Sequence, residues 1–102
     1  MKKITVSLFL SLVFATNALA HTALMSCFDE GEGTITCEGG FSDGSSASGV
    51  VFRVEQNGKT ILKSKLNESS EINFKKPDGD YQAIFDAGEG HQVYIDSKDI
   101  VE

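Results

Sequence analysis

Basic residues are scarce in this chain, and their scarcity argues against one class of partner. Nine lysines and arginines stand against fifteen acidic residues, so the formal net charge is −6. Lys2 and Lys3 belong to a leader that we expect to be removed, and without them the net charge is −8. Nucleic acids are bound through basic patches that neutralise phosphates, so we expect no nucleic-acid partner. An acidic surface suits a cation or a basic partner instead.

Catalytic motifs are also lacking. The chain has no Ser-His-Asp set, no paired nucleophile and base, and no cofactor fingerprint. The small-residue segment 39–49 lacks the Lys-Ser or Lys-Thr ending and the following helix of a phosphate-binding loop, so we expect it to link two hairpins. These absences predict a binding protein and not an enzyme.

Only one long apolar run is present, and it lies at the N-terminus. Two lysines precede a mostly apolar stretch over residues 4–15, and Ala18-Leu19-Ala20 then gives the small-x-small pattern of a cleavage site. The pattern predicts a signal peptide over 1–20, with an uncleaved membrane anchor as the alternative. No second apolar run follows, so we expect no membrane insertion after cleavage. The two-lysine leader indicates a bacterial periplasm.

Helical periodicity is missing after the leader, and short alternating runs replace it. Val50–Glu55 alternates apolar and polar residues, and Asn57-Gly58 follows as a strong hairpin signal. Turn signals recur about every 8–12 residues, which predicts one all-β domain over 21–102, an antiparallel β-sandwich of six to seven short strands with a tail at 97–102. The positions expected to face inward are Val50, Phe52, Val54, Leu62, Leu66, Ile72, Phe74, Tyr81, Ala83, Phe85, His91, Val93 and Ile95.

Cysteine is limited to Cys27 and Cys37, which flank a glycine-rich turn. A hairpin folded about Glu32 places the two cysteines opposite each other, because each lies five residues from it. Export favours oxidation, so we expect a cross-strand disulfide worth roughly 3 kcal/mol on the chain-entropy model. The alternative is a pair of free thiols that serve as soft metal ligands.

Histidine is equally scarce, and both histidines stand at unusual places. His21 becomes the N-terminal residue when the leader is removed, and His91 ends the turn Asp86–His91 between two strand-like runs. A histidine at the N-terminus offers its α-amine and a ring nitrogen to one metal ion. The ring of His91 makes three nitrogens, a set that suits Cu(II) or Ni(II).

Other side chains extend this hypothesis, and simpler interpretations compete with it. Met25 or a free Cys27 would supply a soft axial ligand, and Asp86 or Glu89 would orient His91 or bind the metal directly. Against this, terminal residues are often disordered, Met25 suits a core position, and His91 shares its strand face with apolar residues. The sequence leaves these alternatives open.

Two resemblances add to this hypothesis. From Phe41 onward, the chain reads Phe-Ser-Asp-Gly-Ser-Ser-Ala-Ser-Gly-Val, a Val-x-Phe-x-Val strand, Asn-Gly-Lys and then Asn-Phe-Lys-Lys-Pro-Asp-Gly-Asp-Tyr. This pattern resembles transthyretin-like or carboxypeptidase-regulatory-like domains. Asp-Ala-Gly-Glu-Gly-His at 86–91, with the mature N-terminal histidine, resembles the small periplasmic accessory subunits of energy-coupling-factor nickel/cobalt uptake transporters.

The second resemblance implies a function. It implies a periplasmic accessory protein that binds nickel or cobalt through His21 and His91 and works with membrane transporter subunits. Two alternatives remain from the residues themselves: a periplasmic copper-binding protein with the same ligands, and a metal-free β-sandwich that binds another protein.

Overall fold

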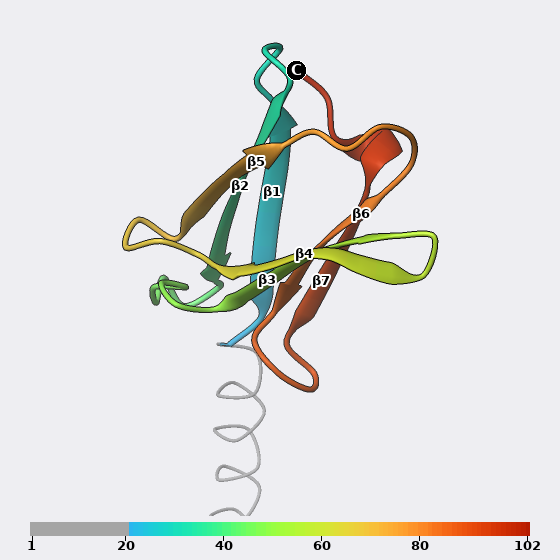
Figure 1. Ribbon diagram of the computed structural model, residues 1–102. Coiled ribbons are helices and arrows are strands. Elements are labelled where there is room, and N and C mark those ends of the chain that lie inside the picture. Colours follow the sequence, from blue (N-terminus) through green and yellow to red (C-terminus); the bar gives the residue numbers. More distant parts are fainter. Residues whose placement is uncertain (1–20) are drawn as a thin grey trace, which may run out of the picture.

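Residues 21–102 form two antiparallel β-sheets in the computed structural model (Figure 1). The predicted signal peptide, residues 1–20, lies outside the described residues. One sheet has the strand order β1-β2-β5, and the other has the order β4-β3-β6-β7. The strands are β1 (Ala23–Asp29), β2 (Thr34–Phe41), β3 (Val51–Gln56), β4 (Lys59–Lys65), β5 (Glu71–Lys75), β6 (Gln82–Asp86) and β7 (Gln92–Asp96). The predicted all-β sandwich is therefore confirmed.

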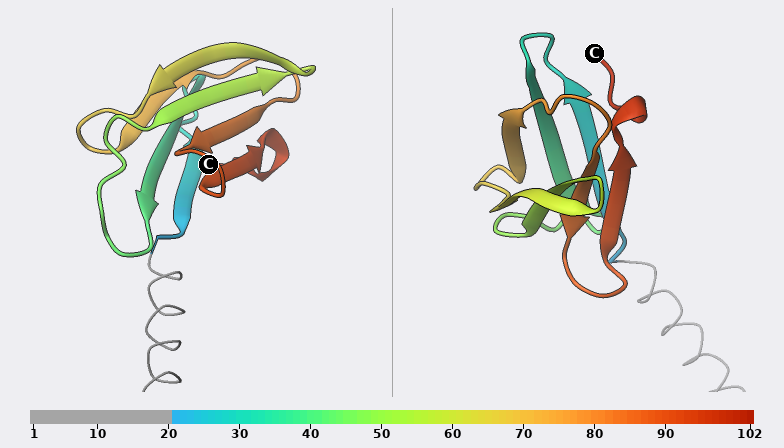
Figure 2. Two further views of the ribbon diagram at one scale, coloured as in Figure 1. Left: turned by 90° about the horizontal axis from the view of Figure 1, so that it is seen from below. Right: turned by 45° about the vertical axis from the view of Figure 1, so that its right-hand side comes forward.

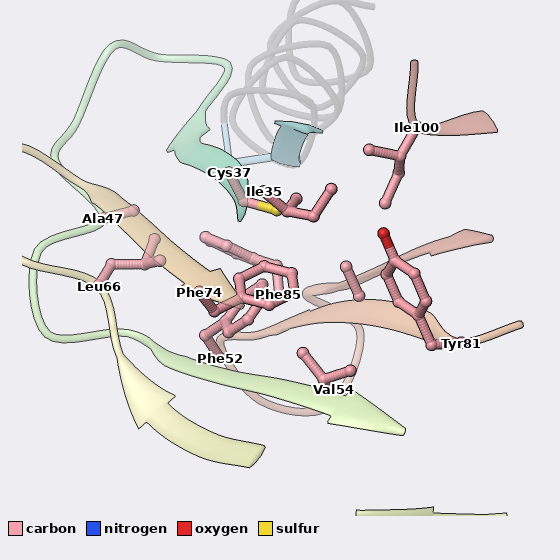
Figure 3. Packing of buried hydrophobic residues seen from close by; sticks show 11 residues of the cluster. Ile35, Cys37, Ala47, Phe52, Val54, Leu66, Phe74, Tyr81, Phe85 and Ile100 are labelled. Carbon is pink, nitrogen blue, oxygen red and sulfur yellow. The ribbon is translucent and has the colours of Figure 1, made fainter. Parts of the chain in front are cut away.

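The hydrophobic core lies between the inner faces of the two sheets (Figure 3). Its largest fully buried side chains include Phe52, Phe85 and Ile35, each worth about 1.5–3 kcal/mol when buried. The ring of Phe74 lies 5.4 Å from that of Phe52, measured between centroids. Twelve of the thirteen positions expected to face inward lie in this core or pack against it, and His91 is the exception.

Ile84 and Ile100 are two of the buried residues that were not expected. Ile84 is fully buried although the alternation of β6 places it on the outer face, where it lies between Arg53 of β3 and Tyr94 of β7. The predicted tail contains a single 3-10 turn (Ser97–Asp99), and it places Ile100 in the core at 7% exposure. Neither burial follows from strand alternation, because one depends on neighbouring side chains and the other on a short turn.

The disulfide prediction is confirmed. Cys27 of β1 pairs directly with Cys37 of β2, and their sulfurs are bonded with the Cα atoms 4.1 Å apart. Both cysteines face the core, and Figure 3 shows the sulfur beside Ile35. The alternative of free thiols as metal ligands is wrong, because residues 21–102 contain no free cysteine.

Strand β2 continues through Gly39 and Gly40, which the sequence had placed in the linking segment. A Cβ atom on Gly39 would lie 2.5 Å from Cε2 of Phe85 and 2.7 Å from Cδ1 of Leu66. The strand therefore uses a glycine where the opposite sheet approaches its backbone closely. At Gly40 a Cβ atom would meet nothing within 4 Å.

This difference gives a matched pair of variants. We expect Gly39→Ala to destabilise the domain by about 1–3 kcal/mol, because a methyl group there overpacks the core. Gly40→Ala makes the same chemical change one residue away, in open space, and should cost much less. Denaturant unfolding of both variants is the measurement. Equal stability of the two would contradict the close approach at Gly39.

The two ends of the sandwich carry different segments. The start of β1 and the turn between β6 and β7 lie at one end, whereas the β1–β2 turn and the C-terminus lie at the other (Figures 1 and 2). Within residues 21–102 no helix is long and apolar enough to cross a membrane. Because His21 precedes β1 and His91 precedes β7, the fold carries both histidines to the first of these ends.

Candidate metal centre

The chain just before β1 is hydrogen-bonded to the segment that follows β2. The amide N–H of Thr22 donates to Oγ of Ser42 at 3.0 Å, and the amide N–H of Ser42 donates to the carbonyl of Thr22 at 2.9 Å. Next to this link, Nδ1 of His21 lies 2.9 Å from Oδ2 of Asp43. The predicted mature N-terminal residue is thus held at this end of the sandwich, although its side chain is 66% exposed.

Asp43 is a fixed carboxylate that the sequence did not single out. Its Oδ1 accepts hydrogen bonds from the hydroxyl of Ser45 at 2.6 Å and from the amide of Ser45 at 2.9 Å. These two bonds, and then the nearby ring of His21, hold the pKa of Asp43 below its usual value. The Asp-x-Ser spacing signals a local turn of this kind. Nothing in the sequence indicates that the free oxygen of this carboxylate reaches His21.

The turn that carries His91 is closed by its own backbone. The amide of Ala87 donates to the carbonyl of His91 at 3.0 Å, and the amide of His91 donates to the carbonyl of Gly88 at 2.9 Å. Gly88 and Gly90 have φ angles of 109° and 80°, in the region that residues with a Cβ atom adopt rarely. The two glycines of the Gly-x-Gly-His pattern therefore allow this turn to form, and the turn sets the position of His91 just before β7.

Asp86 supports the turn and does not contact the His91 ring. Its Oδ1 accepts from the amide of Gly88 at 3.0 Å and from the side-chain amide of Gln92 at 3.1 Å. Its Oδ2 lies 3.3 Å from Nη2 of Arg53. The bonds from Gln92 and Gly88, with Arg53 beside them, lower the pKa of Asp86. Asp86 therefore acts on His91 only through the backbone of the turn.

The ring of His91 has one nitrogen engaged and one available. Its Nδ1 lies 3.3 Å from the carbonyl oxygen of Glu89. A carbonyl only accepts hydrogen bonds, so this contact is a hydrogen bond when Nδ1 carries the proton. In the neutral tautomer of that kind, Nε2 has the lone pair that a metal needs. The contact of Glu89 with the His91 ring is made by its backbone carbonyl, whereas the sequence had suggested its carboxylate.

Both histidines line one surface hollow, which we call the histidine hollow. It has a volume of about 250 Å³ and is lined by His21, Phe41, Ser45, Ala87 and His91. A water molecule occupies about 30 Å³ of the liquid, so an ion with bound water fits there. The structure therefore brings together two side chains seventy positions apart in the sequence.

Met25 is not part of this hollow. It is half-buried on the inward face of β1 and packs against the core. The hollow's lining includes neither Met25 nor the carboxylates of Asp86 and Glu89. Of the expected ligands, the structure places only His21 and His91 together.

The donors fit a metal only when the α-amine of His21 is free. Within residues 21–102, no group of three or more histidine, cysteine, aspartate or glutamate side chains is arranged to hold a metal ion. Two imidazoles alone are a weak set, and cleavage before His21 adds a third nitrogen that chelates together with the ring. Three nitrogens beside the anionic Asp43 suit a divalent ion that prefers nitrogen ligands.

Known proteins provide no further guide to this centre. Comparisons of the chain with models of protein families, with curated proteins and with solved structures found no match. The function proposed below therefore depends on the side chains of this chain, their geometry and the motifs that they form.

Proposed function

We propose that the mature protein is a periplasmic accessory protein of a nickel or cobalt uptake system and binds the ion as cargo in the histidine hollow. The observation that carries the proposal is the shared position of His21 and His91 in that hollow. In this proposal the α-amine and Nδ1 of His21 chelate the ion once Nδ1 has left Asp43, and Nε2 of His91 completes a set of three nitrogens.

The predicted leader and the disulfide support the proposed compartment. A leader of this pattern directs export, and disulfides persist in oxidising compartments such as a bacterial periplasm. The bond between Cys27 and Cys37 is a property of the folded domain, so the hollow forms on a scaffold suited to that compartment.

Copper is the second candidate cargo, because the same donors serve it. Divalent copper binds nitrogen sites more tightly than nickel or cobalt, so affinity alone will favour copper in a test tube. The two proposals differ in whether Ni(II) and Co(II) also bind tightly. An importer's accessory protein needs tight and reversible binding of those two ions.

Calorimetric titration of Ni(II), Co(II) and Cu(II) into the domain starting at His21 tests the proposed function. We expect one ion per chain, and we expect His91→Ala to weaken binding by about 100-fold, because one of three nitrogens is lost. Tight binding of copper alone would favour the copper-binding protein. Binding that is absent, or indifferent to His91→Ala, would leave the metal-free interaction domain.

Asp43 provides a separate prediction about the same hollow. Asp43→Asn keeps an oxygen for the Ser45 hydrogen bonds and removes the negative charge beside His21. We expect Ni(II) affinity to fall about tenfold, because a negative charge close to the bound ion is lost. Asp99→Asn is the control, since it makes the same charge change in the C-terminal 3-10 turn. Equal affinity of the two variants would show that Asp43 has no part in binding.

A further inference from the structure

The lysines of this acidic domain are gathered on one side. Residues 21–102 contain seven basic residues, and five of them lie on β4 or at the end of β5: Lys59, Lys63, Lys65, Lys75 and Lys76. Strand β4 carries three of these lysines and no acidic residue. Of the five, only Lys76 forms an ion pair, with Asp29, within the described part of the chain. Four exposed cations thus remain without a partner on a domain of net negative charge.

The same side is where the sandwich is open. Strands β1 and β7 pack together and close one side, whereas β4 and β5 run apart from the short loop that joins them (Figure 1). Between them lies a groove of about 900 Å³, which we call the lysine groove. Its charged lining residues are Lys65, Lys75 and Lys76, with the carboxylates of Glu71 and Asp78, and Lys59 and Lys63 lie on β4 outside the lining.

The lysine groove has an apolar floor and a free strand edge. Leu62, Ile72 and Phe74 line it together with Ile61, which is 50% exposed. In the register of β4 with β3, Ile61 has no partner, because Leu62 pairs with Val54 and the next pair skips one residue. Strand β4 is the last strand of its sheet, so its outer backbone groups have no neighbouring strand in residues 21–102.

Lysines on an edge strand commonly guard it against pairing with other chains. Edge lysines of this kind disfavour pairing with a neutral or basic strand, but they attract an acidic strand. The β4 edge of a second copy fits poorly, because it would bring two rows of lysines together. A flat anionic surface would satisfy the charges and leave the concave apolar floor uncovered. The combination of floor, edge and charge fits an extended acidic segment best.

We propose that the lysine groove binds an extended segment of a partner protein that alternates carboxylate and apolar residues and adds as a strand to the edge of β4. Backbone hydrogen bonds to β4 supply affinity, and the lysines and the apolar floor select the side chains. The groove shares no lining residue with the histidine hollow, so docking leaves the hollow open. This inference does not depend on the proposed metal function.

The test is a nuclear magnetic resonance titration of the folded domain with a synthetic peptide. The probe is a seven-residue alternating glutamate and valine peptide, which matches the length of β4. Two control peptides replace the glutamates by lysines or the central valine by proline, which removes a backbone donor. We expect the acidic peptide alone to shift the amide signals of β4 and the lining of the groove.

Charge-reversal variants test whether peptide binding depends on the lysines of the groove or only on the net charge of the domain. We expect Lys65→Glu combined with Lys75→Glu to weaken peptide binding by about tenfold or more. Lys98→Glu reverses a charge outside the groove and should change binding by less than about twofold. Thermal unfolding checks that each variant is folded, and Ni(II) titration should be the same in all of them.

Three results of the peptide titrations would overturn the proposal. These are no shift at β4 with the acidic peptide, equal binding of the lysine peptide, and equal weakening by Lys98→Glu. Lysine-dependent binding to phosphatidylglycerol vesicles without binding of the acidic peptide would also overturn it, and would identify a membrane surface as the occupant.

Discussion

One extra residue ahead of His21 should abolish tight metal binding, with an expected loss of more than about 100-fold in Ni(II) affinity. The addition turns the α-amine of His21 into an amide, whose nitrogen carries no lone pair suited to the metal, and it moves the free amine to the added residue. The addition substitutes none of the five residues that line the hollow, so both imidazole rings remain. The free amine then belongs to the added residue and lies one residue further from the ring, so His21 no longer forms a chelate on one residue.

A glycine placed before His21 is the variant, and calorimetric titration with Ni(II) is the measurement. The control adds a glycine after Glu102, at the opposite end of the sandwich, and should bind as the unchanged domain does. An unaltered affinity with the N-terminal glycine would show that the α-amine is not a ligand. The same comparison predicts that the unprocessed chain binds poorly, so cleavage of the leader would activate the centre.

Removing the disulfide should have the largest effect on stability. The bond joins residues ten positions apart, and the chain-entropy model gives about 3 kcal/mol for a loop of this size. Small domains are stable by roughly 5–15 kcal/mol in total, so the loss is a large fraction. We expect Cys27→Ala combined with Cys37→Ala to lower the midpoint of thermal unfolding by about 15 °C.

Thermal unfolding with and without a reductant is the measurement. Reductant should destabilise the unchanged domain by a similar amount and leave the double alanine variant as it was. Because Cys37 is fully buried, alanine is the better replacement, since serine would bury a hydroxyl group as well. A loss below about 1 kcal/mol in both experiments would contradict a structural role for the bond.

Local sequence signals were sufficient to predict the strands and the disulfide of the scaffold. Alternation located the strands because each sheet buries one face, and the symmetric spacing about Glu32 located the disulfide because a hairpin pairs residues equally distant from its turn. The burial of Ile84 and Ile100 was missed, since it depends on Arg53, Tyr94 and a 3-10 turn that lie beyond any local pattern.

The site was predictable only in part, for a related reason. Unusual positions singled out His21 and His91, and the structure places both in one hollow. Asp43 was missed because its contact with His21 crosses from one segment to another. Met25 was proposed from its soft sulfur alone, and the inward face of β1 takes it into the core.

X-ray absorption spectroscopy of the Ni(II)-loaded domain starting at His21 would test the two-histidine centre most directly. Imidazole rings give a characteristic outer scattering pattern, so the number of bound rings can be counted. We predict two rings and additional nitrogen or oxygen ligands, with no sulfur. One ring or none, or a sulfur ligand, would contradict a centre built from His21 and His91.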